Sequence, residues 1–395
     1  MDVMVARSHL RLRILRQTST LARRRSAWLL LPLLVVVSDG CMSNAGDPIH
    51  VEREVLVPRL FGNPSALARL GDGGFVIAGS ANTGWAVRTD AGGRELWRYE
   101  EPYDRNQEKM DQSTFHGAIA LANGHILLVG QSLHTNEYGT GLIVVLDDRG
   151  RLIERRVLSP MDQHANFASL DDVTPWGEGF ALLGGGTDYT HGYLWLVKLD
   201  KNGTKEWDRI DGALAGISGL ASGDGTLLQV GSAKGVGITV VRLNQKGERQ
   251  ASVDADFLEA KLVRSYTSRD EPRLVARDRH LKSFLVSLGH DLQVKDVSPM
   301  SGPDIKEGAA FGLPDGSVAL FGYQLIDAGG AYRSTLGRWG HKERVVEVRL
   351  PNRGDGSYSF RGAVRISPTR FVALRDQVGN NDAETGAVLS WVSFN

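Results

Sequence analysis

The stretch LARLGDGGFVIAGSANTGWAVRTDAGGRELWRY, residues 67–99, contains one complete structural unit of this chain. Its apolar runs at 75–78 and 85–87 are separated by turns rich in Asp, Asn and Gly. Apolar runs of about 5 to 7 residues cut by such turns are typical of strands, because glycine supplies the positive φ that tight hairpins require. The stretch therefore predicts four strands in one antiparallel sheet.

The unit recurs down the chain. In each copy one residue closes the apolar run of the second strand, and this residue is a glycine except in two copies, where it is an arginine. The mean spacing is about 49 residues, which lies within the range of propeller blades. In chain order the residues are Gly79, Gly130, Gly184, Gly231, Arg277, Gly322 and Arg375.

The two ends of the repeat region complement each other. The last copy offers three strands, at 362–367, 370–374 and 387–394, while residues 51–57 alternate like a lone strand. We therefore predict an all-β fold: a single seven-bladed β-propeller of four-stranded antiparallel blades, from about residue 50 to 395. It would be closed by its N-terminal strand, because pairing 51–57 with 387–394 removes an exposed sheet edge.

The first 40 residues have the composition of an export signal. Arginines are frequent between residues 7 and 25, and an apolar run follows at 27–37. At about 11 residues this run is too short to span a bilayer of about 30 Å, but it suits the core of a signal peptide. We expect residues 1–40 to be a signal peptide and 41–49 a lipidated tether.

Cys41 is the only cysteine of the chain. Its place after such a signal, with Gly40 before it, resembles the lipobox of bacterial lipoproteins, although the two residues before Gly40 depart from that pattern. The resemblance implies acylation of Cys41, and Met42 in the next position favours the periplasmic leaflet of the outer membrane. Cleavage after Ala45, giving a secreted soluble protein, is the alternative.

Composition excludes some partners and bonds. The 395 residues carry 46 Lys and Arg against 46 Asp and Glu, so the chain lacks the basic excess that nucleic-acid binding requires. A single cysteine cannot form an intramolecular disulfide. Asp or Asn opens several turns with Gly three positions later, as in 90–93 and 200–203. We interpret these acidic residues as turn formers rather than calcium ligands, since they lack the alternating oxygen ligands of a calcium loop.

Residues 89–97, TDAGGRELW, and 199–207, LDKNGTKEW, resemble the tryptophan-docking repeat of quinoprotein-like propellers. The resemblance implies the fold, but no quinone cofactor, because the vicinal disulfide typical of such dehydrogenases cannot form here. The chain also resembles exported bacterial propeller lipoproteins. A distant analogue is the propeller lipoprotein of the outer-membrane assembly machinery, which scaffolds partners and catalyses nothing.

The predicted connections between strands are short on one face of the propeller. On the other face they are long, and residues 131–141 and 323–334 are two of these long loops. Loops on a rigid scaffold are where binding residues concentrate. Imidazole suits zinc or copper, but no histidine pair has metal-ligand spacing, so we expect no metal site. The candidate partner-binding residues are Tyr103, His116, His134, Tyr138, His164, Tyr189, His191, Arg277 and Arg375. We expect the two arginines nearer the centre, facing an acidic ligand or paired locally with Asp278 and Asp376.

The sequence lacks a nucleophile elbow, a zinc-protease motif and a phosphate loop. We therefore expect a monomeric, non-catalytic scaffold without a cofactor that binds a protein or cell-envelope glycan on the long-loop face. An immunity protein against a rival's toxin is one form of this hypothesis. The alternative is a glycan lyase or hydrolase, with Glu137, Asp162 and Asp188 as candidate carboxylates.

Overall fold

The chain divides into two compact units, Met1–Val37 and Ser38–Asn395. All residues that the computed structural model describes belong to the second unit, to which the following refers. These residues are 49–57, 62–81, 83–102, 112–134, 137–160, 167–187, 192–212, 214–223, 225–233, 237–265, 271–280, 282–300, 306–325, 332–340, 344–349, 357–378 and 386–395. The predicted signal peptide and most of the tether, including Cys41, lie outside them.

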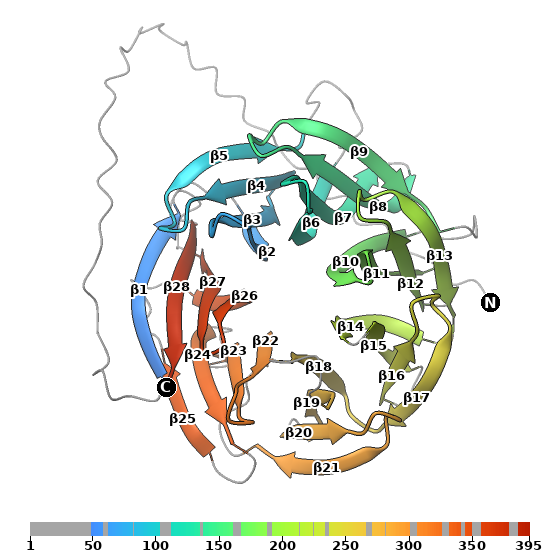
Figure 1. The fold of residues 1–395 in the computed structure, drawn as a ribbon, viewed down its shortest axis with the longest axis vertical. Coiled ribbons are helices and arrows are strands. Elements are labelled where there is room, and N and C mark those ends of the chain that lie inside the picture. The colour runs from blue at the N-terminus through green and yellow to red at the C-terminus, as the bar shows by residue number, and fades with distance from the viewer. Residues whose placement is uncertain are drawn as a thin grey trace, which may run out of the picture. The chain divides into compact units, whose positions relative to one another are not determined.

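The described residues form strands and turns and no helix, which agrees with the predicted all-β class. Accordingly, they include no helix that could cross a membrane. Figure 1 shows the strands following one another around a ring, with the earliest strand of each group innermost. The first groups are β2 (Asn63–Arg69), β3 (Phe75–Ser80), β4 (Gly84–Thr89) and β5 (Glu95–Glu100), then β6 (Gln112–Ala120), β7 (Ile126–His134), β8 (Glu137–Leu146) and β9 (Leu152–Leu158).

The middle of the chain continues the same order. The groups are β10 (Phe167–Trp176), β11 (Gly179–Thr187), β12 (Gly192–Leu199) and β13 (Lys205–Asp211), then β14 (Leu214–Gly223), β15 (Thr226–Ala233), β16 (Gly237–Leu243) and β17 (Arg249–Ala255). They are followed by β18 (Glu259–Arg264), β19 (Arg273–Arg277), β20 (Ser283–Leu288) and β21 (Val294–Pro299), then β22 (Lys306–Gly312), β23 (Val318–Leu325), β24 (Tyr332–Trp339) and β25 (Arg344–Arg349).

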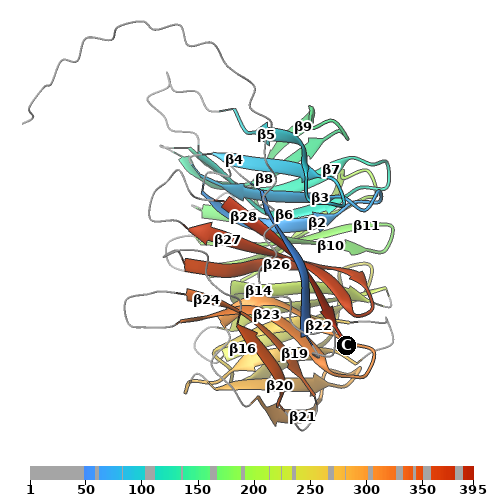
Figure 2. The ribbon, with the colours of Figure 1, turned by 90° about the vertical axis from the view of Figure 1, so that its left-hand side faces the viewer.

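The last group combines both ends of the described chain. β26 (Ser357–Ser367), β27 (Arg370–Val378) and β28 (Gly386–Phe394) pair in order, and β1 (Ile49–Val57) is the fourth strand, beside β28. β1 and β28 are antiparallel, with Val51 opposite Val392 and Val57 opposite Ala387. The two strands lie side by side in Figure 2. The first strand therefore has the partner that its alternating pattern predicts.

Two neighbouring pairs of groups are joined into eight-stranded sheets. The joints are short parallel contacts, between Phe167 of β10 and Gly139 of β8, and between β18 and β22. All other pairings are antiparallel, and apart from β1 with β28 they join successive strands. The joints thus connect groups without changing their internal order.

The apolar core is distributed between neighbouring groups rather than gathered in one place. Each of the seven buried clusters draws side chains from two successive groups. One of them joins the last group to the first, packing Val372 and Trp391 against Phe75 and Ile77. Burial of apolar surface stabilises a fold by about 25 cal/mol per Å². These junctions are therefore the main source of attraction between neighbouring groups.

Tryptophan docking occurs where the sequence resemblance implied it. The indole of Trp97 lies against Gly150 of the following group, where a Cβ would be 2.7 Å from the ring, and its Nε1 donates to the Asp148 carbonyl at 2.9 Å. Trp207 packs on Gly247 in the same way. Gly150 and Gly247 have positive φ, so glycine serves both the turn and the indole.

The same contact joins the end of the chain to its beginning. Trp391 of β28 packs on Gly93, in the turn between β4 and β5. The guanidinium of Arg53 lies 3.9 Å from the Trp391 ring centroid, and it donates to the Ala91 carbonyl at 2.9 Å. The first strand therefore contributes to holding the last group against the first.

The Asp and Asn residues of the tight turns are structural, as predicted. Asp90 Oδ1 accepts hydrogen bonds from the backbone N–H groups of Gly92 and Arg94, at 2.8 and 2.9 Å. Asp200 does the same with Asn202 and Thr204, both at 2.8 Å. A carboxylate that satisfies two turn amides stabilises the turn itself.

The expectation that the residue closing each apolar run also ends its strand was wrong at most positions. β7 continues beyond Gly130 to His134 and β11 continues beyond Gly184 to Thr187, and the same holds for Gly231 in β15, Gly322 in β23 and Arg375 in β27. The predicted loops at 131–141 and 323–334 are correspondingly shorter, since the flanking strands run into them. The physical role of these glycines is described below, because it determines the candidate site.

Candidate functional site in the central channel

The innermost strands contain bulges at a common level. In β6 the register slips by one residue between Phe115 and Gly117, so His116 has no opposite residue on β7. A bulge re-aims the side chain of the extra residue and bends the strand. Equivalent single-residue slips leave Ser65 in β2, Asp171 in β10 and Arg361 in β26 as extra residues.

The glycines found in the sequence lie opposite these bulges. Gly130 pairs with Phe115, and a Cβ on it would overlap the carbonyl oxygen of Thr114. Gly184 stands in the same relation to the carbonyl of Ser169. At these two positions the bulged strand occupies the space of a side chain, which favours glycine, whereas Arg375 stands opposite the bulge at Arg361.

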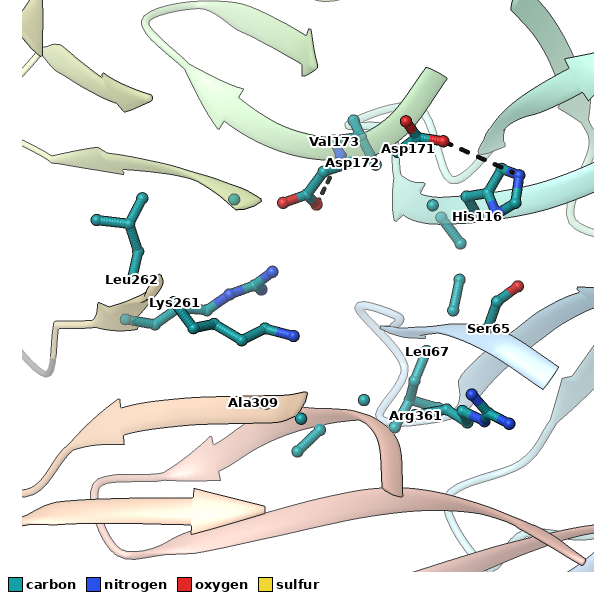
Figure 3. Close-up of a pocket in the computed structure, with 18 of the residues that line it drawn as sticks. Ser65, Leu67, His116, Asp171, Asp172, Val173, Lys261, Leu262, Ala309 and Arg361 are labelled. Atoms are coloured by element: carbon teal, nitrogen blue, oxygen red, sulfur yellow. Dashed lines mark hydrogen bonds and ion pairs between the residues drawn. The ribbon is translucent and has the colours of Figure 1, made fainter. Parts of the chain in front are cut away.

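A cavity of about 550 Å³ lies among the innermost strands. The bulged residues line it, and Figure 3 shows His116 and Asp171 on neighbouring strands at one side. Asp172 lies beside them, whereas Lys261 and Arg361 come from strands at the other side. The cavity therefore brings together charged residues that are far apart in the sequence.

His116 and Asp171 form the polar pair of one wall. The Nε2 atom of His116 lies 4.0 Å from Asp171 Oδ1 and 2.9 Å from Thr114 Oγ1. Ser169 Oγ donates to Asp171 Oδ2 at 3.0 Å. Burial raises the pKa of Asp171 above its usual range, and the neighbouring Asp172 adds to this, while His116 and Ser169 act against it. Asp171 therefore holds a proton more readily than an exposed carboxyl group.

A second wall, which β14 separates from β10, is cationic. β18 supplies Lys261 and Arg264, both exposed to the channel. Arg361 is held by an ion pair of 2.6 Å to Asp376, whose side chain is only 3% exposed. The buried carboxylate thus fixes the Arg361 guanidinium.

Of the predicted residues, the structure brings His116 to the channel. Arg375 is buried and pairs with Glu54 of β1, and Arg277 is buried and pairs with Glu259 of β18. Neither arginine lines the cavity. Asp278, one suggested local partner, accepts hydrogen bonds from the backbone of its own turn.

The remaining predicted residues are not placed. Tyr103, His164, Tyr189 and His191 lie outside the described residues, as do Asp162 and Asp188 of the enzyme alternative. His134 ends β7, and Glu137 and Tyr138 open β8, but their side chains are not described. A binding rim on the long-loop face therefore stays a prediction.

Most of the channel residues were missed by the sequence analysis. A usable signal was present, because Phe115-His116-Gly117-Ala118 and Phe360-Arg361-Gly362-Ala363 share a pattern that varies at one position. The variable position is the bulge. Among the described residues no group of three or more His, Cys, Asp or Glu could hold a metal ion.

No protein-family model and no curated protein matches the sequence. The fold is similar to solved propellers. The β-propeller domain of Cps50 (Swd1) from Myceliophteria thermophila aligns at 12% identity and a TM-score of 0.54, over 86% of this chain and 99% of that one. The Dos1 propeller aligns at 9% identity and 0.51, over 84% and 78%.

Puromycin hydrolase also aligns, at 15% identity and a TM-score of 0.50, over 80% of this chain but only 50% of that enzyme. Similarity at these identities shows the fold and not the activity. The chain thus has an all-β fold of the propeller type.

Proposed function

We propose that this chain is an exported scaffold: a seven-bladed propeller, closed by its first strand, that binds a protein partner on its long-loop face. The observation that carries the proposal is the structure of the turns on one face of the ring. These are tight turns, such as those at Asp90 and Asp200, whose polar groups bond within the turn. Such turns offer little surface to a partner, so the other face is the better candidate.

Closure by the first strand supports this proposal. β1 pairs with β28, and a buried cluster and the Trp391 contact join the last group to the first. A closed ring has no open edge between first and last blades, and it presents its loops on a rigid frame.

The location forms part of the proposal. Residues 1–40 would be the signal peptide, and acylated Cys41 would anchor residues 50–395 to the periplasmic leaflet of the outer membrane. Each buried CH₂ group contributes about 0.8 kcal/mol, so several acyl chains together hold a protein stably. Replacing Cys41 with Ser should move the protein from the membrane fraction to the soluble fraction. Unchanged fractionation would refute the anchor.

The scaffold is tested by site-specific photocrosslinking in cells. A photoreactive phenylalanine analogue at Tyr138 or Tyr189 should give discrete protein adducts, whereas the same analogue at Ala91 or Lys201, exposed residues of the turn face, should give none. The turn-face variants are the matched controls, because they carry the same probe on the same scaffold. Equal adducts from both faces, or none from the loop face, would contradict the proposal. An adduct degraded by glycosidase but not by protease would identify a glycan instead.

A further inference from the structure

The channel carries opposite charges on two walls that β14 separates. Asp171 and Asp172 come from β10, while Lys261 and Arg264 come from β18, and Figure 3 shows Asp172 and Lys261 on different strands of the cavity wall. The charges come from separate strands, so the fold sets how far apart their backbone positions lie. A ligand with one fixed positive and one fixed negative end would fit this arrangement.

The channel also has room for a ligand. Its volume of about 550 Å³ falls within the range of roughly 300 to 1,000 Å³ that is usual for small-molecule sites. Much of the remaining wall consists of small residues, including Gly117, Ala118, Gly308 and Ala309. These residues leave the backbone close to the cavity and fill little of it.

The lining narrows the chemical class of the ligand. Quaternary ammonium groups are usually held by cages of aromatic rings, and His116 is the only ring among the described lining residues. A primary ammonium group is the better match for carboxylates, since its N–H groups can donate to them. A simple anion would be attracted by Lys261 and Arg264 but would face the carboxylates of β10.

We propose that the central channel binds a small amino-carboxylate zwitterion, from an amino acid to a tripeptide in size. Its ammonium group would lie on the Asp171 and Asp172 side, and its carboxylate on the Lys261 and Arg264 side. This site is separate from the partner-binding face proposed above. It would remain if that face bound nothing, and the loop-face crosslinks do not test it.

The probes are alanine, dialanine and trialanine, each in three forms: with free termini, N-acetylated and C-amidated. Isothermal titration calorimetry on the full chain at low ionic strength compares their affinities. At the best-fitting length, each capped form should bind about tenfold or more weakly than the free form, because each cap removes a charge-assisted hydrogen bond. Equal binding of free and capped forms, or no binding at any length, would overturn the proposal.

Two substitutions assign the walls. Asp172→Asn should abolish the preference for a free amino group while keeping the preference for a free carboxylate, and Lys261→Gln should do the reverse. Asp256→Asn and Lys295→Gln are matched controls, because both residues form exposed ion pairs away from the channel. The controls should bind as the unchanged protein does. The wall assignment would be contradicted if both channel variants lost both preferences, or if neither variant lost any preference. The capped ligands test the unchanged protein, so they remain decisive where a variant does not fold.

Discussion

Replacing Gly130 with Ala tests the relation between the recurring glycines and the bulges of the inner strands. Gly130 lies inside β7 and pairs with Phe115, next to the bulge that directs His116 into the channel. A Cβ at this position would overlap the Thr114 carbonyl oxygen and lie 2.9 Å from Phe115 Cα. Both obstacles are backbone atoms, so no side-chain rotation can remove them.

The expected cost follows from two opposing effects. Forcing an extra methyl group into a packed interior costs about 1 to 3 kcal/mol of stability. We take the upper value, about 3 kcal/mol, because the atoms in the way belong to the backbone. Replacing glycine also reduces the conformational freedom of the unfolded chain, which stabilises the folded state by about 0.4 to 1 kcal/mol. The net prediction is a destabilisation of about 2 kcal/mol, with displacement of His116 from the channel.

The assay is equilibrium unfolding in urea, followed by tryptophan fluorescence. Gly71→Ala is the matched control, because a Cβ there would have no atom within 4 Å and its φ lies outside the left-handed region. The control should change the unfolding midpoint little. If Gly130→Ala and Gly71→Ala were equally stable to within about 0.5 kcal/mol, the bulge would not be the reason for the glycine.

Three further substitutions test the charged groups. Glu54→Gln should destabilise the fold by about 3 kcal/mol in urea unfolding, because it leaves the buried Arg375 guanidinium without its carboxylate, and a loss below 1 kcal/mol would argue against that role. Burial opposes ionisation of Asp315, but hydrogen bonds from Ser317 and Arg338 outweigh it and lower its pKa to about 2, so its stabilisation is present above pH 4 and is lost as the pH falls through about 2. Asp315→Asn should therefore be less stable than the unchanged protein at pH 6, by under about 1 kcal/mol because the pair is partly exposed, and this difference should shrink as the pH falls through about 2. Burial raises the pKa of Asp171, so keeping this carboxyl group ionised at neutral pH costs folding stability. Asp171→Asn should therefore be at least as stable as the unchanged protein at pH 7. As the pH falls, the unchanged protein should gain stability relative to this variant.

Local patterns in the sequence were sufficient for the strands and turns. Alternation and Asp–Gly turns give the groups, and the positive φ of Gly93 and Gly203 agrees with the turn chemistry expected there. The pairing of β1 with β28 followed from counting strands in the last copy. These features depend on short-range chemistry or on the order of the strands, both of which a single sequence contains.

The channel could not be derived in the same way. A bulge is a property of two paired strands, so Gly130 looked like a strand end although it accommodates the backbone of the neighbouring strand. Asp172 and Lys261 line one cavity only because the groups form a ring, and neither residue carries a motif. Arg375 was expected to face an acidic ligand or to pair with Asp376, but it pairs with Glu54, which lies near the other end of the chain.

The proposed closure of the ring by the first strand is the feature on which the channel and both faces depend. It is measured most directly by crosslinking β1 to β28 in a chain whose Cys41 is replaced by Ser. His50 lies opposite Ser393, so His50→Cys with Ser393→Cys should form a disulfide, since paired residues have the Cα separation of about 4.4 to 6.8 Å that a disulfide needs. Ser390 lies three residues from Ser393, about 10 Å further along β28, so His50→Cys with Ser390→Cys should not. Peptide mapping after mild oxidation should find the first bond and not the second. Failure of the first bond in folded protein, or equal yields of both, would contradict a ring closed by the first strand.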